Sequence, residues 1–105
     1  MPIEHNRLLL QIERAMRAIN QGTIKPVLPE LTLDDLNPVI TMVARTRARY
    51  LQELFDLATS CQDGSPTDDQ IARLRRLRLS YEEQVAAAQA LETAIHRGYL
   101  DVQID

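Results

Sequence analysis

The stretch Gln62-Asp63-Gly64-Ser65-Pro66 decides how this chain of 105 residues folds. Its glycine, serine and proline are typical of a tight turn, and Ser65 and Pro66 suit the cap and first position of the next helix. Long stretches with helical spacing of apolar residues flank it on both sides. Because a short connection forces neighbouring helices to run antiparallel, the sequence predicts a long helical hairpin built from residues 33/38–60 and 66–97.

The helix before the turn has two possible starts. Thr32 with Asp35 forms a shortened capping box, and Asn37-Pro38 offers a cap followed by a proline at the first helical position. Apolar residues between positions 36 and 58 cover an arc of about 160° on a helical wheel. An arc this wide predicts contacts with two neighbours.

The helix after the turn is expected to end at Gly98 and to be about 48 Å long. Its main apolar stripe consists of Leu74, Leu77, Tyr81, Val85, Ala88, Leu91 and Ile95. A second stripe of mostly small residues would allow another backbone to approach closely: Ala72, Leu79, Ala86 and Ala90. This helix is therefore also predicted to contact two neighbours.

The ends of the chain complete the predicted architecture. A first helix over 3–20 stops at Gly22 and carries an apolar stripe of His5, Leu8, Leu9, Ile12, Ala15, Met16 and Ile19. An ordered, proline-containing crossover follows over 21–31, and its Pro26-Val27-Leu28-Pro29 also fits the minimal pattern of polyproline ligands. The tail, 99–105, alternates apolar and polar residues, which predicts an extended segment that folds back and packs, stays loose, or joins the edge of a partner's sheet.

The sequence thus predicts an all-α fold of three helices in one domain, 1–105. The first helix, about 27 Å long, is too short to cover both apolar arcs of the hairpin. A homodimer would cover them by completing a helical bundle, and a different protein partner is the alternative. The residues expected at this interface are Arg47, Tyr50, Leu54, Leu74, Leu77, Leu79 and Tyr81.

Composition excludes several classes of protein. Hydrophobic residues make up 45% and charged residues 26%, which argues against disorder. The net charge of −3 disfavours a general nucleic-acid binder, and neither a secretory signal nor a membrane-spanning stretch is evident. One cysteine, Cys61, rules out an internal disulfide and suits a reducing compartment, so the expected location is the cytoplasm.

Arginine is unusually prominent, since eleven of the twelve basic residues are arginines. Two runs without acidic residues fall in the same band of the predicted hairpin and form a candidate anion site for nucleic-acid phosphates or an acidic protein: Arg45, Arg49, Arg73, Arg75, Arg76 and Arg78. Alternatively, these side chains are solvated and pair with Asp69, Glu53 or Glu82.

Arg47 lies near the middle of the apolar arc of the helix before the turn, where an unpaired buried charge would be costly. Three explanations remain open at this stage. The side chain reaches solvent or pairs with an acid such as Glu82, it sets the register of a dimer interface, or it binds an anionic group.

The sequence favours no catalytic or metal site. Glu92 and His96 share a helical face but supply only two ligands, and Cys61 has no histidine nearby in sequence. The three glycines are isolated, so no phosphate-binding loop or cofactor site is expected. The first hypothesis is a non-catalytic interaction module, such as an adaptor, regulator or chaperone-like protein, that acts as a homodimer. The alternative is an anion or nucleic-acid binding protein.

Overall fold

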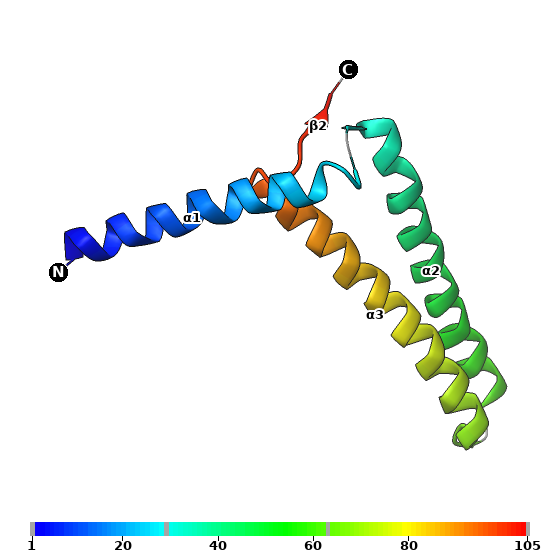
Figure 1. Ribbon diagram of the computed structural model, residues 1–105. Coiled ribbons are helices and arrows are strands. Elements are labelled where there is room, and N and C mark those ends of the chain that lie inside the picture. Colours follow the sequence, from blue (N-terminus) through cyan, green and yellow to red (C-terminus); the bar gives the residue numbers. More distant parts are fainter. Residues whose placement is uncertain (1, 29, 63, 105) are drawn as a thin grey trace. The chain divides into compact units, whose positions relative to one another are not determined.

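The computed structural model describes residues 2–28, 30–62 and 64–104 and has an all-α fold, as predicted (Figure 1). Its elements are α1 (Pro2–Ile24), β1 (Leu31–Thr32), α2 (Leu33–Ser60), α3 (Asp68–His96) and β2 (Val102–Gln103). Three positions of the predicted loops and tail, Pro29, Asp63 and Asp105, lie outside the described residues. The chain packs as a hairpin unit, 37–89, and a terminal unit, 1–36 with 90–105. The expectation of one domain stays a prediction.

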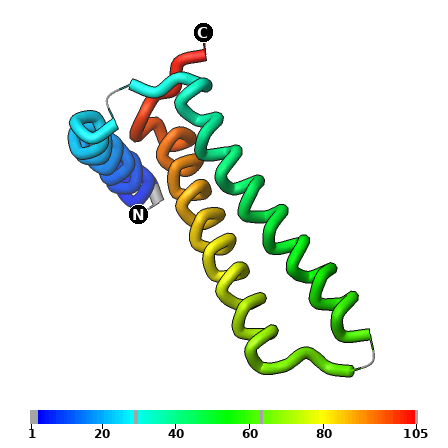
Figure 2. Tube along the Cα trace, turned by 90° about the vertical axis from the view of Figure 1, so that its right-hand side faces the viewer, coloured from blue at the N-terminus to red at the C-terminus, as the bar shows by residue number. Residues whose placement is uncertain are grey.

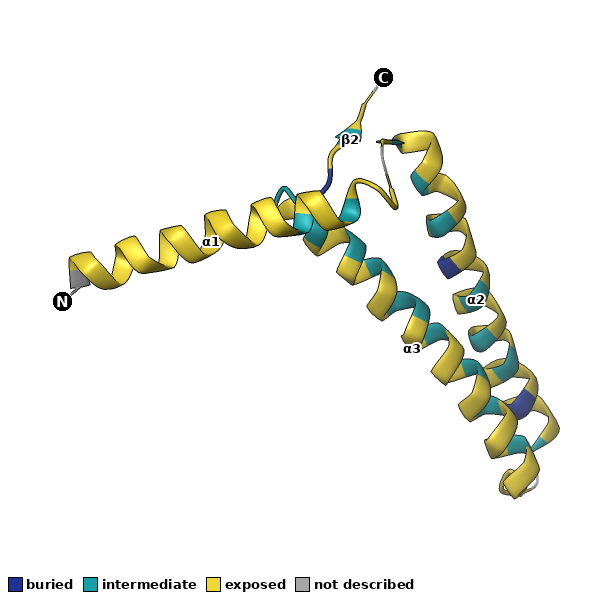
Figure 3. Ribbon diagram, viewed as in Figure 1, coloured by how far each residue is buried: buried dark blue, intermediate teal, exposed yellow. Residues whose placement is uncertain are grey.

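The hairpin unit consists of α2 and α3 lying side by side in opposite directions (Figures 1 and 2). The side chains that face the other helix are half-buried at regular helical intervals, and Val43 and Leu57 of α2 are buried (Figure 3). The predicted antiparallel hairpin is therefore confirmed, although a single pair of helices buries only one face of each.

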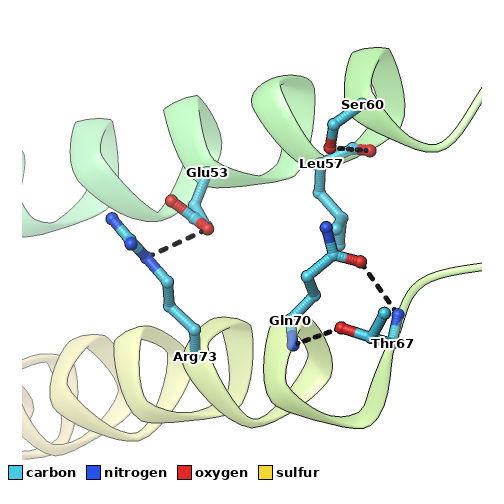
Figure 4. Close-up of polar contacts among 6 residues, drawn as sticks. All are labelled: Glu53, Leu57, Ser60, Thr67, Gln70 and Arg73. Atoms are coloured by element: carbon cyan, nitrogen blue, oxygen red, sulfur yellow. Dashed lines mark hydrogen bonds and ion pairs between the residues drawn. The ribbon is translucent and has the colours of Figure 1, made fainter.

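The cap of α3 differs from the prediction. The helix begins at Asp68, and Thr67 caps it in place of Ser65. The backbone N–H of Gln70 donates to Thr67 Oγ1 at 3.2 Å, and the N–H of Thr67 donates to Gln70 Oε1 at 2.8 Å (Figure 4). This reciprocal pair satisfies two backbone donors at once, which a serine two positions earlier would not do.

The start of α2 follows the first of the two predicted alternatives. The backbone N–H of Thr32 donates to Asp35 Oδ2 at 2.8 Å, and α2 begins at Leu33. The helix then continues through Pro38, so the predicted second start at Asn37 is wrong. A proline this close to the start removes only one backbone hydrogen bond, and the capping box already fixes the first turn.

In the terminal unit, α1 is longer than the predicted 3–20 and passes through Gly22. A glycine ends a helix by adopting positive φ, and among the described glycines only Gly98 does so. The chain leaves the helix two residues later, where the N–H groups of Val27 and Leu28 donate to the carbonyl of Ile24. The crossover is therefore shorter than the predicted 21–31.

The C-terminal end of α3 is held by α1. Gly98 has φ of 74° and ends the helix as predicted, and the N–H of Tyr99 donates to the carbonyl of Ala94. Arg17 Nε donates to the carbonyl of Arg97 at 3.3 Å, and Gln21 Nε2 donates to that of Gly98 at 2.7 Å. Side chains of α1 therefore satisfy the carbonyls of the two residues that follow the end of α3.

The tail of the chain folds back within the terminal unit. Strand β2 pairs with β1 in parallel, with Leu31 opposite Val102 and Thr32 opposite Gln103. Leu100, just before β2, is buried. Within the predicted extended tail, Val102–Gln103 thus forms a strand, and its strand partner belongs to the same chain.

Candidate functional site

Arg47 is bound to an aromatic side chain of the facing helix. Its Nε donates to the hydroxyl of Tyr81 at 3.0 Å, and its guanidinium carbon lies 5.5 Å from the centroid of the Tyr81 ring. The ring of Tyr50 lies 6.0 Å from the same ring. The guanidinium is therefore stabilised by a hydrogen bond and a cation–π contact while Arg47 stays exposed.

The structure pairs Arg47 with Tyr81 and not with the suggested Glu82, and the exposure of Arg47 agrees with the alternative that its side chain reaches solvent. Glu82 lies 3.9 Å from the Nε of Arg78, its neighbour one turn earlier on α3. The tyrosine hydroxyl takes the place of the acid for Arg47, and a hydroxyl is an acceptor that charge patterning along the sequence does not reveal. Register setting and anion binding by Arg47 stay predictions.

The residues expected at an interface divide into two groups in the structure. Tyr50, Leu74, Leu77 and Tyr81 are half-buried on the facing sides of α2 and α3, so they serve the hairpin itself. Leu54 and Leu79 are exposed, each at 47%. Within this set, Leu54, Leu79 and Arg47 are therefore the residues that the structure leaves exposed.

Helix α2 also carries a second apolar face that α3 does not cover. It consists of Ile40, Ala44, Leu51, Leu54, Phe55 and Ala58, all exposed, and we call it the outer face of α2. At 100° per residue its centre lies roughly 100° around the helix from the side packed on α3. Phe55 is 70% exposed. The sequence predicted that the wide apolar arc of this helix contacts two neighbours. One part of that arc packs on α3, and the outer face of α2 is the remaining part.

Part of the predicted arginine band surrounds one shallow hollow of about 520 Å³ in the hairpin unit. The hollow is lined by Arg49, Gln52, Glu53, Asp56, Arg73, Arg76 and Leu77. Arg73 Nε lies 3.1 Å from Glu53 Oε1 (Figure 4), an ion pair across the hairpin and not one at the helical spacing that the sequence suggested. Three guanidinium groups thus share the hollow with two carboxylates, and Arg45, Arg75 and Arg78 are not part of its lining.

Nucleophilic and metal-ligating groups do not gather in the part of the chain that the structure describes. No group of three or more histidine, cysteine, aspartate or glutamate side chains is placed to hold a metal ion among those residues. The half-buried thiol of Cys61 donates to Gln70 Oε1 at 3.5 Å, so it caps the turn end of the hairpin. Within the described residues, no helix has the length and apolar character needed to cross a membrane.

Helix α1 carries the other uncovered apolar face, which we call the α1 stripe: Leu8, Leu9, Ile12, Met16 and Ile19. All five side chains are exposed, in line with the exposed colour along most of α1 (Figure 3). Ile19 is exposed at 67%. The apolar spacing of this helix was visible in the sequence. Periodicity identifies an apolar face without saying what covers it, so the sequence did not reveal that the terminal unit leaves the stripe open.

Comparison of the chain with protein-family models, with curated proteins and with solved structures finds no match. The function proposed below therefore rests on the residues and their geometry.

Proposed function

We propose that this chain is a non-catalytic helical protein-interaction module that acts as a homodimer in the cytoplasm. The main support is the exposure of two apolar faces, the outer face of α2 and the α1 stripe. Contiguous apolar surfaces of this kind usually mark sites of protein association. The single thiol of Cys61 suits a reducing compartment.

The mechanism is burial of helix faces. Each half-exposed leucine, isoleucine or phenylalanine that becomes buried contributes roughly 1 kcal/mol, about half the value for full burial. Charged side chains at the rim, such as Arg47 and the Arg78–Glu82 pair, would orient the partner more than they would add affinity. Because the two faces belong to different units, one can bind a second copy while the other binds a different protein, as an adaptor, regulator or chaperone-like protein requires.

The mass of the full chain in solution tests the homodimer. Light scattering coupled to gel filtration is expected to give about 24 kDa, twice the 12.0 kDa of one chain. The measurement should be repeated at roughly 100 µM, where even a dimer of micromolar affinity is fully populated. A mass of one chain at that concentration would refute the proposal.

The alternative function, binding of anions or nucleic acid, depends on the hollow lined by Arg49, Arg73 and Arg76. If the chain had this function, it would bind duplex DNA and polyphosphate with an affinity that falls steeply as the salt concentration rises. Arg76→Ala would then reduce the slope of log affinity against log salt concentration by about 1. Arg45→Ala, outside the hollow, is the matched control. Because Glu53 and Asp56 offset the charge of the hollow, we expect no salt-dependent binding and no difference between the variants.

A further inference from the structure

The outer face of α2 has the spacing of a surface that binds another helix. Its positions 40, 44, 47, 51, 54 and 58 follow one another at intervals of four, three, four, three and four residues. This is the heptad spacing at which the side chains of two helices interlock. Because the series spans about 28 Å, the expected occupant is a helix of similar length.

One position in this series is charged. At 100° per residue, Arg47 lies roughly 30° from the centre of the outer face, between apolar positions on both sides. The carboxylates of the same half of the helix lie elsewhere. Glu53 and Asp56 are each roughly 150° from that centre, at the hollow where Glu53 pairs with Arg73 (Figure 4). The outer face therefore combines exposed apolar side chains with the positive charge of Arg47.

The guanidinium of Arg47 is held in position while most of its donors stay open. Its Nε is taken up by the Tyr81 hydroxyl at 3.0 Å, and the ring of Tyr81 lies beneath its guanidinium carbon at 5.5 Å. Within the part of the chain that the structure describes, Arg47 forms no ion pair. The terminal N–H groups of a fixed guanidinium are suited to bind a carboxylate in bidentate fashion.

The charge of Arg47 restricts which helices can cover the outer face. A helix with a wholly apolar stripe would remove the guanidinium from water and offer it no acceptor, which costs several kcal/mol for a buried charge. A single polar or charged residue in a heptad series selects partners in the same way, because only a complementary residue on the other helix compensates for its burial.

A second copy of the chain does not supply that complement. If two outer faces paired in antiparallel orientation over 40–58, position 47 would lie opposite position 51 of the second copy. The two Arg47 side chains would then be roughly 6 Å apart along the axis, and a parallel pair would place them side by side. Like charges at such a distance disfavour the pairing.

We propose that the outer face of α2 binds a helix of a different protein whose apolar stripe carries one glutamate or aspartate, and that this carboxylate pairs with Arg47. The apolar side chains around it, Leu51, Leu54 and Phe55 among them, contribute affinity by burial, and the carboxylate selects the partner. The inference rests on the proposed function as an interaction module and names the kind of partner that this face takes.

A set of three helical peptides tests the selection. Each is a labelled peptide of about 18 residues with a leucine stripe and a glutamine-rich polar side, and only the residue in the middle of the stripe differs: glutamate, glutamine or lysine. Fluorescence anisotropy measures their binding to the full chain. The glutamate peptide is expected to bind roughly 10-fold or more tightly than the glutamine peptide, and the lysine peptide most weakly.

Charge reversal at position 47 shows whether Arg47 makes the choice. Arg47→Glu is expected to reverse the order, so that the lysine peptide binds most tightly, and Arg47→Gln is expected to remove the preference. Arg45→Glu is the matched control, because it makes the same change of net charge roughly 130° from the centre of the outer face. It is expected to keep the wild-type order. Equal helical content by circular dichroism shows that the variants fold alike.

Two leucines of equal exposure show where the peptide binds. Leu54 and Leu79 are each 47% exposed, but Leu54 belongs to the outer face whereas Leu79 lies on α3, roughly 160° around that helix from Tyr81. The measurement uses the glutamine peptide, which carries no charge at the middle of its stripe. Leu54→Asp is expected to weaken its binding roughly 10-fold or more, and Leu79→Asp is expected to leave its binding unchanged.

The outcomes separate this proposal from the homodimer. Absence of peptide binding, equal affinity for all three peptides, or a glutamate preference that persists in Arg47→Glu overturns the acidic partner, whatever the mass of the chain. Conversion of a wild-type dimer to a monomer by Leu54→Asp also overturns it, because a second copy would then cover this face. A chain that stays a monomer but reverses its preference with Arg47→Glu refutes the homodimer alone and supports the partner proposed here.

Discussion

Leu57→Ala is expected to lower the free energy of unfolding by about 2–3 kcal/mol. Leu57 is 8% exposed on the side of α2 that faces α3, and besides Val43 it is the only described side chain of the hairpin unit that is buried. Removing its branched end deletes apolar contacts and leaves a cavity between two rigid helices. Because so few side chains are buried in this unit, the side chains around the cavity cannot repack to fill it.

Leu54→Ala is the matched control for this substitution. It makes the same chemical change three residues away on the same helix, but Leu54 is 47% exposed. Unfolding of both variants in urea is monitored by circular dichroism. Leu57→Ala should unfold at a clearly lower urea concentration than the wild type, whereas Leu54→Ala should lower the free energy of unfolding by less than about 1 kcal/mol. Equal losses would show that the hairpin has no buried side distinct from its outer face.

The hairpin was predictable because its signals are local. A turn rich in glycine, serine and proline, a capping box at Thr32 and Asp35, and a run of apolar residues each act within a few positions of the chain. Local signals also explain the small errors. Ser65 and Thr67 are both good caps, and the decision between them depends on whether Gln70 reaches back, which residue type alone does not fix.

The contacts of the terminal unit were not predictable, because they join residues far apart in sequence. Arg17 and Arg97 are separated by 80 positions, and Gln21 and Gly98 by 77. The pairing of β1 with β2 is likewise distant, and each strand has only two residues. Periodicity predicts which side of a helix is apolar, but a polar anchor such as Gln21 gives no periodic signal.

The residues of the candidate site were predictable from the sequence, but their grouping in space was not. The sequence identified the wide apolar arc of α2, the arginine band and Arg47, and the structure shows which of these the hairpin itself uses. It pairs Arg47 with Tyr81 and gathers only three of the six candidate arginines, Arg49, Arg73 and Arg76, around one hollow. Rotation of each helix about its axis decides such groupings, and that rotation is set by packing between the helices.

Leu100→Ala is expected to destabilise the terminal unit by about 2–3 kcal/mol and to act there more strongly than in the hairpin. Leu100 is 8% exposed and is the buried apolar side chain among the described residues of that unit. It lies between the end of α3 and β2, so its loss weakens the hold of the tail on β1. A parallel two-stranded pair has little stability without such packing.

Hydrogen exchange followed residue by residue separates the two effects. Protection is expected to fall in Leu100→Ala at the backbone amides of α1, 20–24, and of 98–103, while amides around Val43 and Leu57 in the hairpin unit keep theirs. Ile104→Ala is the control, because Ile104 lies in the same tail but is 88% exposed. An equal loss of protection across both units in Leu100→Ala would show instead that the two units unfold as one cooperative body. Loss of packing in one unit would then lower the stability of the other by the same amount.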